Sequence, residues 1–120
     1  MTKILLVDDD PFILGMTGAI LEDESIEVLT AESGDECLAQ IAAAPDVQVV
    51  VSDMNMPGMD GLALYAALRQ KGYQRPFILL TGDDAEPLGR AHPELDAVIT
   101  KDADLSEVLP SLIKKMLSLD

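Results

Sequence analysis

Residues 49–61 read VVVSDMNMPGMDG and are the most informative stretch of the chain. A run of small and apolar residues leads into Asp53, and a loop rich in methionine, proline and glycine then ends in Asp60 and Gly61. An apolar run without polar alternation is typical of a strand that is buried on both faces, as the strands of parallel sheets are. The stretch therefore predicts a buried strand that carries one carboxylate to its C-terminal end.

Similar apolar runs alternate with helical patterns along the whole chain. Five strands are predicted, at KILLV (3–7), IEVLTA (26–31), VQVVVSD (47–53), PFILLT (76–81) and AVIT (97–100). Helical spacing of apolar residues predicts helices at 11–23, about 33–44, 61–70 and 105–119. Pro87, Gly89 and Pro93 punctuate the stretch 82–96, so that at most one or two helical turns fit there.

This alternation predicts an α/β protein, a three-layer sandwich with a five-stranded parallel sheet and about five helices, the fourth short or irregular. A chain of 120 residues is the size of one ordinary domain, and we expect a single domain over residues 1–120.

Residues that favour helix ends support these boundaries. Asp10 is placed to cap the first helix with Pro11 as its first residue, Ser33 to cap the second and Asp60 to cap the third. The last helix, Leu105 to Leu119, contains Pro110, which predicts either a late start near Ser106 or a kink.

The first helix carries no charge from Pro11 to Leu21. We expect one face to lie on the sheet and another to be partly exposed. The expected inner residues are Ile13, Met16, Thr17 and Ile20, and the expected outer residues are Phe12, Leu14, Gly18 and Leu21. The outer face is either covered by neighbouring elements or is a docking patch for a phosphate donor.

Composition excludes several classes of protein. The net charge of −14 disfavours direct binding of nucleic acid, whose phosphates it would repel. No apolar run approaches the roughly 20 residues of a membrane span, so no membrane insertion is expected. The first apolar stretch runs directly into three aspartates, unlike a signal peptide, and the single Cys37 cannot form an internal disulfide. Both features predict a cytoplasmic location.

The strand ends carry the residues that suggest chemistry. In parallel α/β sheets, ligands bind beyond the carboxyl ends of the strands. The first strand ends at Asp8 and Asp9, the third at Asp53 and the fourth at Thr81, and the fifth runs into Lys101. If the first and third strands are neighbours, the carboxylates converge and repel one another unless a cation is present. Hard oxygen ligands of this kind favour Mg²⁺.

The motifs ILLVDDDP, VVVSDMNMPGMDG and ILLTG, with the strand that ends at Lys101, resemble the receiver domain of two-component response regulators over essentially the whole chain. The resemblance implies a CheY-like, flavodoxin-like fold with strand order 2-1-3-4-5. It also implies that Asp53 accepts a phosphoryl group and that Asp8 and Asp9 form the acidic pair, with Asp9 favoured over Asp8 as the direct Mg²⁺ ligand. Asn55 would offer its backbone carbonyl to the metal.

The same resemblance assigns the remaining site residues. Thr81 and Lys101 match the hydroxyl and the lysine of the family, and Pro57 and Gly61 match the turn after the phosphorylated residue. The resemblance implies a histidine kinase or histidine phosphotransfer protein as partner, with a downstream effector protein or output domain. The implied protein is a phosphoacceptor and not an enzyme, beyond transferring phosphate to itself and losing it again.

Two positions depart from the receiver pattern. Val98 stands where receivers usually have an aromatic residue, and Asp102 stands where they usually have proline after the lysine. Because a cis bond before a non-proline residue costs about 2.5–4 kcal/mol, we predict a trans bond between Lys101 and Asp102. Val98 has no ring to swing inward, so we expect phosphorylation to act instead by ordering residues 82–96.

Two alternatives use the same residues. A degenerate receiver would serve only as a protein-binding module, which Val98 and Asp102 favour slightly and the intact acidic set disfavours. A Mg²⁺-dependent phosphohydrolase resembling the haloacid dehalogenases would need a second acid two residues after the nucleophile, where this chain has Asn55. A dinucleotide-binding domain is excluded because no G-x-G-x-x-G follows the first strand.

Overall fold

The five predicted strands form one parallel sheet. The computed structural model describes residues 2–22 and 26–117, with strands β1 (Thr2–Val7), β2 (Ile26–Ala31), β3 (Val49–Asp53), β4 (Phe77–Thr81) and β5 (Ala97–Thr100). The strand order is β2-β1-β3-β4-β5, and every neighbouring pair is parallel. The order places β1 beside β3, so the two acidic strand ends are neighbours.

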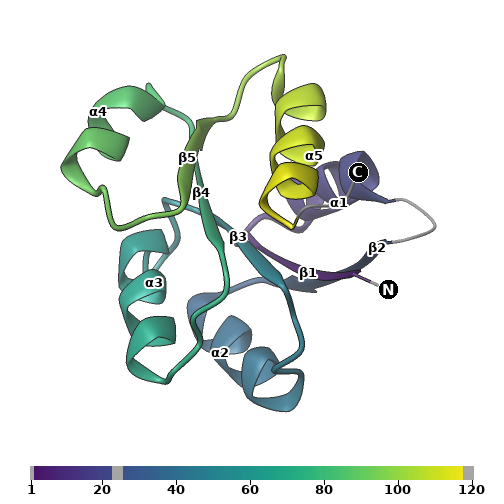
Figure 1. The fold of residues 1–120 in the computed structure, drawn as a ribbon, viewed down its shortest axis with the longest axis vertical. Coiled ribbons are helices and arrows are strands. Elements are labelled where there is room, and N and C mark those ends of the chain that lie inside the picture. Colours follow the sequence, from purple (N-terminus) through teal and green to yellow (C-terminus); the bar gives the residue numbers. More distant parts are fainter. Residues whose placement is uncertain (1, 23–25, 118–120) are drawn as a thin grey trace.

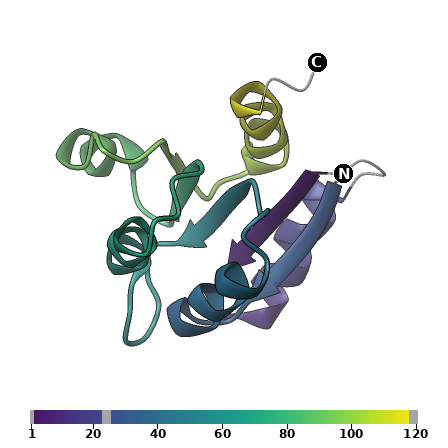
Figure 2. The same ribbon diagram turned by 60° about the horizontal axis from the view of Figure 1, so that its bottom comes forward.

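Helices cover both faces of this sheet. They are α1 (Pro11–Leu21), α2 (Gly34–Ala43), α3 (Gly61–Gln70), α4 (Ala85–Ala91) and α5 (Leu105–Met116). Helices α1 and α5 lie together on one face, and α2 and α3 lie on the other, with α4 beside β5 (Figures 1 and 2). The predicted three-layer α/β class and strand order are therefore confirmed.

The core is split into two layers because successive side chains of a strand point to opposite faces. Leu5, Val50 and Leu79 contribute to the layer under α2 and α3. Ile4 and Val51 contribute to the layer under α1 and α5. Every residue of β3 and of β4 is buried, as the continuous apolar runs predicted.

The predicted helix caps are present. The Asp10 carboxylate accepts a hydrogen bond from the amide of Phe12, and the Asp60 carboxylate accepts one from the amide of Ala63. The Ser33 hydroxyl likewise accepts one from an amide in the first turn of α2. These caps fix where α1, α2 and α3 begin, immediately after the strand ends or the loop that follows them.

Helix α5 begins at Leu105, slightly before the late start that was one of the two predictions. It continues through Pro110, which lies inside the helix, to Met116. The expected end at Leu119 lies outside the described residues. Among the described residues, no helix combines the length and the apolar character that crossing a membrane requires.

The predicted orientation of α1 is wrong at three positions. Leu14 and Leu21, expected on the outside, are buried, whereas Met16, expected on the inside, is 53% exposed. Thr17 is buried and Phe12 is 71% exposed, as predicted. The buried stripe thus follows positions 14, 17 and 21. The helix has no charged residue to mark a polar face, so its apolar pattern did not determine which side meets the sheet.

Helix α4 is the least embedded helix among the described residues. It has seven residues and none of them is buried, although Leu88 packs partly against the core. This agrees with the predicted short fourth helix. Val98 of β5 is only partly buried and lies below α4, within 3.9 Å of where a Cβ atom would stand on Gly89.

Candidate metal centre

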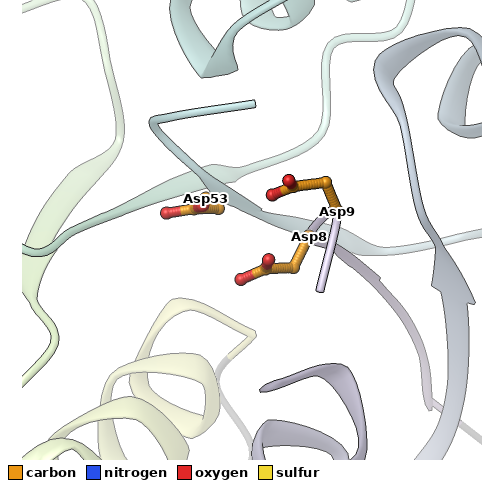
Figure 3. Close-up of side chains that lie close together, drawn as sticks. All are labelled: Asp8, Asp9 and Asp53. Carbon is orange, nitrogen blue, oxygen red and sulfur yellow. The ribbon is translucent and has the colours of Figure 1, made fainter. Parts of the chain in front are cut away.

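Three carboxylates meet at the carboxyl end of the sheet. Asp8 and Asp9 follow β1, and Asp53 is the last residue of β3. One oxygen of each side chain lies within 4.8 Å of the other two (Figure 3). Asp8 and Asp53 are 7% and 6% exposed, whereas Asp9 is open to solvent. The site therefore has two buried acids and one accessible acid.

Strand register explains why Asp8 and Asp53 converge. Strands β1 and β3 pair in parallel with Val7 opposite Ser52, so the next residues in each strand are also opposite. Ile4 and Leu6 point to the face of the sheet that α1 and α5 cover, and the same alternation places Asp8 on that face. The same alternation along β3 places the Asp53 side chain on that face as well. Both carboxylates consequently stand on the α1 and α5 side of the rim.

Lys101 brings a positive charge to the same point. Its Nζ atom lies 2.6 Å from Oδ1 of Asp53 and 3.6 Å from Oδ2 of Asp8. Its backbone amide donates a hydrogen bond to the carbonyl of Thr81 at 2.7 Å, which holds the Lys101 backbone beside the end of β4. The peptide bond to Asp102 is trans, as predicted. The lysine therefore reaches the acids without a proline after it.

The ionised form of Asp8 is disfavoured by its surroundings. Burial is the main cause that raises the pKa of this carboxyl above its ordinary value, and the neighbouring Asp53 charge raises it further. A hydrogen bond from the Asp10 amide, at 3.0 Å, and the charge of Lys101 lower it in part. One ammonium group thus compensates only part of the negative charge that three carboxylates concentrate here.

The residues fit a divalent cation of the hard, oxygen-preferring class. Three carboxylates facing one ammonium group leave an excess of negative charge, and the converging oxygens are the ligands that Mg²⁺ prefers. Asp9 is exposed and leaves the site open to water and to a ligand. Asn55, the fourth predicted metal residue, lies exposed in the loop two residues after Asp53.

The loop after β3 is held close to the strand end. The amide of Gly61 donates to the carbonyl of Met54 at 2.9 Å. A Cβ atom at Gly61 would lie 2.5 Å from the Leu79 side chain and 2.6 Å from the carbonyl oxygen of Asp53, so no other residue fits without displacement. Gly58, beside the exposed Pro57, has a φ of 74°, which glycine adopts readily. The special residues of the opening motif therefore shape this turn.

Thr81 stands at the end of β4, next to β3 in the sheet. It is 2% exposed, and its hydroxyl accepts a hydrogen bond from the amide of Asp83 at 3.1 Å. The predicted site residues Asp8, Asp9, Asp53, Thr81 and Lys101 all lie at the carboxyl edge of the sheet.

Sequence reasoning missed Thr100. Its hydroxyl accepts a hydrogen bond from the amide of Ala85, the first residue of α4, at 2.9 Å. Thr100 is directly opposite Thr81 in the pairing of β4 and β5. The signal that could have found it was a second threonine at a strand end, one residue before Lys101.

Comparison with known proteins agrees with this geometry. Residues 4–113 match the family described as response regulator receiver domain. The chain is 40% identical over 84 residues, 70% of its length, to the transcriptional regulatory protein GlrR of Escherichia coli, of which the match covers 19%. It thus corresponds to about a fifth of that relative.

Solved structures show the same fold over almost the whole chain. The response regulator TrrA of Thermotoga maritima, in complex with Mg²⁺ and BeF, aligns with a TM-score of 0.85 and 30% identity over 97% of this chain and 99% of that one. TrrA in complex with the histidine kinase ThkA aligns with a TM-score of 0.85 and 32% identity over 98% of this chain and 99% of the other. The chain therefore belongs to the family of response regulator receiver domains.

Proposed function

We propose that this chain is a signalling switch that accepts a phosphoryl group on Asp53 in a Mg²⁺-dependent reaction. The observation that carries the proposal is the placement of the Asp53 carboxylate, which is buried, 2.6 Å from Lys101 and within 4.8 Å of Asp8 and Asp9 oxygens. A carboxylate so held is a nucleophile for phosphoryl transfer. The TrrA complex with Mg²⁺ and BeF supports the same reading by similarity.

In the proposed reaction, one oxygen of Asp53 attacks the phosphorus of a phosphohistidine. A phosphorus–oxygen bond forms while the phosphorus–nitrogen bond breaks, and the donor imidazole leaves with the electron pair of that bond. Lys101 pairs with one phosphoryl oxygen, and the Thr81 hydroxyl donates a hydrogen bond to another. The product is an acyl phosphate on Asp53. The chain is thus itself the phosphorylated product and does not act as an enzyme on other molecules.

Asp8, Asp9, Asp53 and the backbone carbonyl of Asn55 would hold the cation. When bound, Mg²⁺ offsets the charge of the carboxylates and of the incoming phosphoryl oxygens. Lys101 supplies the same kind of compensation from the protein itself, because it already contacts Asp53 and Asp8. The exposed Asp9 side chain keeps the approach to this cluster open.

The chemical nature of the label tests this function. After incubation with radiolabelled acetyl phosphate and Mg²⁺, the labelled protein should lose its phosphate in neutral hydroxylamine, which cleaves acyl phosphates. A serine or threonine phosphate would survive this treatment. A label that resists hydroxylamine, or that forms equally well in excess chelator, would contradict the proposal.

The phosphate donor is a histidine kinase or a histidine phosphotransfer protein, and the proposed docking surface is the exposed side of α1. Phe12 and Met16 are 71% and 53% exposed there, and Val108 on the neighbouring α5 is 43% exposed. Helix α1 starts directly after the acidic rim, so a partner on this surface would lie beside Asp53. The TrrA–ThkA complex supports a kinase as partner for a similar receiver.

Substitution of Phe12 separates docking from chemistry. Phe12→Ser removes an exposed ring and should leave phosphorylation by acetyl phosphate unchanged, because this small donor needs no docking surface. It should slow phosphorylation by a histidine kinase that labels the native chain. Gln70→Ala, an exposed change on α3 at the opposite face of the sheet, serves as the control. Equal kinase rates for Phe12→Ser and the native chain would exclude this surface.

We further propose that residues 1–120 are one receiver domain whose state is read by an effector protein or an output domain. The matched relative GlrR is a transcriptional regulatory protein and is about five times longer than the matched segment. The charge of −14 makes direct contact of this segment with DNA unfavourable. Any effect on transcription would therefore pass through a second domain or protein.

A further inference from the structure

Two threonines on neighbouring strands hold the short loop between β4 and α4. The Thr81 hydroxyl accepts from the amide of Asp83 at 3.1 Å, and the Thr100 hydroxyl accepts from the amide of Ala85 at 2.9 Å. The two threonines are opposite each other in the sheet, so their side chains point to the same face. The loop is thus fixed from β4 at one end and from β5 at the other.

Helix α4 has few other interactions that set its position. It has seven residues and no buried one, and isolated helices shorter than about 12 residues are marginal in water. Its first turn has one local side-chain cap, in which the Asp84 carboxylate accepts a hydrogen bond from the amide of Glu86 at 3.2 Å. The preceding amide, that of Ala85, is bound from β5 by Thr100. This contact ties the first residue of α4 to the sheet.

Thr100 is also next to the proposed reaction site. The following residue is Lys101, whose amide donates to the carbonyl of Thr81 and whose Nζ atom contacts Asp53. Thr81 and Lys101 are the two residues that would contact the phosphoryl oxygens. The loop of residues 82–84 follows Thr81 directly, and its far end is held by Thr100, the residue before Lys101.

We propose that Thr100 is a positioning residue for phosphoryl transfer. Thr100 anchors Ala85 and so holds the loop in place. In this position the Asp83 amide of the loop donates a hydrogen bond to the Thr81 hydroxyl, which fills one of its acceptor positions. A threonine hydroxyl has one hydrogen to donate, and this arrangement directs that hydrogen away from the loop and toward a phosphoryl oxygen on Asp53. The inference rests on the proposed function, and it assigns a role to a residue that touches neither metal nor phosphate.

Thr100→Val tests the role because valine keeps the shape and strand preference of threonine but cannot accept the hydrogen bond. Thr100→Ser, which retains the hydroxyl, is the matched variant for rescue. In the metal-free protein, the Ala85 amide should exchange with solvent roughly five-fold faster in Thr100→Val, the effect of losing one ordinary hydrogen bond. Exchange in the core strand β3 should stay unchanged in both variants.

Binding measurements then separate positioning from general damage. The affinity for Mg²⁺ alone, by calorimetry, should be the same in all variants, since the carboxylates are untouched. The affinity for beryllofluoride in saturating Mg²⁺, followed by fluorine NMR, should fall roughly five-fold in Thr100→Val and recover in Thr100→Ser. Equal beryllofluoride affinity in Thr100→Val and the native chain would overturn the inference, as would an equal loss of Mg²⁺ affinity.

A double-mutant cycle with Thr81→Ala gives the sharpest result. If Thr100 acts through the Thr81 hydroxyl, Thr100→Val should cause no further loss once that hydroxyl is gone. Additive losses would show that Thr100 acts by another route and would contradict the inference. Failure of the native chain to bind beryllofluoride at all would instead refute the proposed function, so the two failures are distinguishable.

Discussion

Asp8 is expected to stabilise the bound cation at a cost to the free protein. Its pKa is raised mainly by burial, so the folded state holds the Asp8 proton more tightly than the unfolded chain does. The stability gained from the protonated form is present below the ordinary carboxyl pKa and is lost as the pH rises through the raised value. At neutral pH the ionised group is therefore destabilising.

Asp8→Asn should consequently raise the free energy of unfolding of the metal-free protein at pH 7 by about 1 kcal/mol, a typical single-site effect. Asparagine keeps an oxygen that can accept from the Asp10 amide. Urea unfolding with and without Mg²⁺ measures both consequences, because Mg²⁺ should stabilise the native chain more than the variant. The advantage of the variant should shrink as the pH falls toward 4. A variant less stable than the native chain at pH 7 would contradict this account.

Gly61 is required by the close approach of the loop to β3. Gly61→Ala would place a Cβ atom 2.5 Å from Leu79 and 2.6 Å from the Asp53 carbonyl, and overpacking of this kind costs about 1–3 kcal/mol. The denaturation midpoint should fall, and the amide signal of Asp53 should shift. Gly15→Ala is the control, since a Cβ atom there meets nothing and alanine favours a helix by up to about 1 kcal/mol. Equal effects of the two substitutions would be inconsistent with the structure.

Cys37 is a core residue and is fully buried. Burial raises the pKa of its thiol to about 12, so it remains protonated at pH 8. We expect no modification by iodoacetamide in the native protein at that pH and full modification in urea. Mass spectrometry of the two samples decides this, and rapid labelling under native conditions would show that the thiol is accessible.

At the scale of elements, α4 is the segment in which phosphorylation is expected to change order. Its lack of buried residues predicts weak protection from hydrogen exchange in the free protein. Drawing Thr81 and Gly82 toward a phosphoryl group would tighten the loop and the helix behind it. Exchange with and without beryllofluoride should show increased protection over residues 82–96 and little change around Val98. Full protection of residues 82–96 before the mimic is added would refute this switch.

Most helices and strands could be predicted because apolar strand segments and helix-capping residues are visible within a few neighbouring residues of the sequence. The residues of β2, α3 and β5 match the predicted ranges, and Asp10, Ser33 and Asp60 are caps as expected. The orientation of α1 could not be predicted, because a helix without charge has no polar face that marks the outside. It was decided by the packing of Leu14 and Leu21 against the sheet and α5.

The site is a product of the whole molecule. The sequence predicted which carboxylates, hydroxyl and ammonium groups end the strands, but their meeting depends on β1 and β3 being neighbours. The contact of Lys101 with Asp53 depends on a side chain crossing from β5, beyond what strand spacing determines. Thr100 was missed for the same reason, because its hydrogen bond joins β5 to a helix that follows a different strand.

The central claim is that this assembly directs one phosphoryl group to Asp53. The most direct measurement is intact mass after incubation with acetyl phosphate and Mg²⁺, for the native chain and for Asp53→Asn. The account predicts a gain of one phosphate in the native chain only, and no gain when excess chelator replaces Mg²⁺. A gain of one phosphate in Asp53→Asn as efficient as in the native chain, or undiminished labelling in chelator, would contradict it.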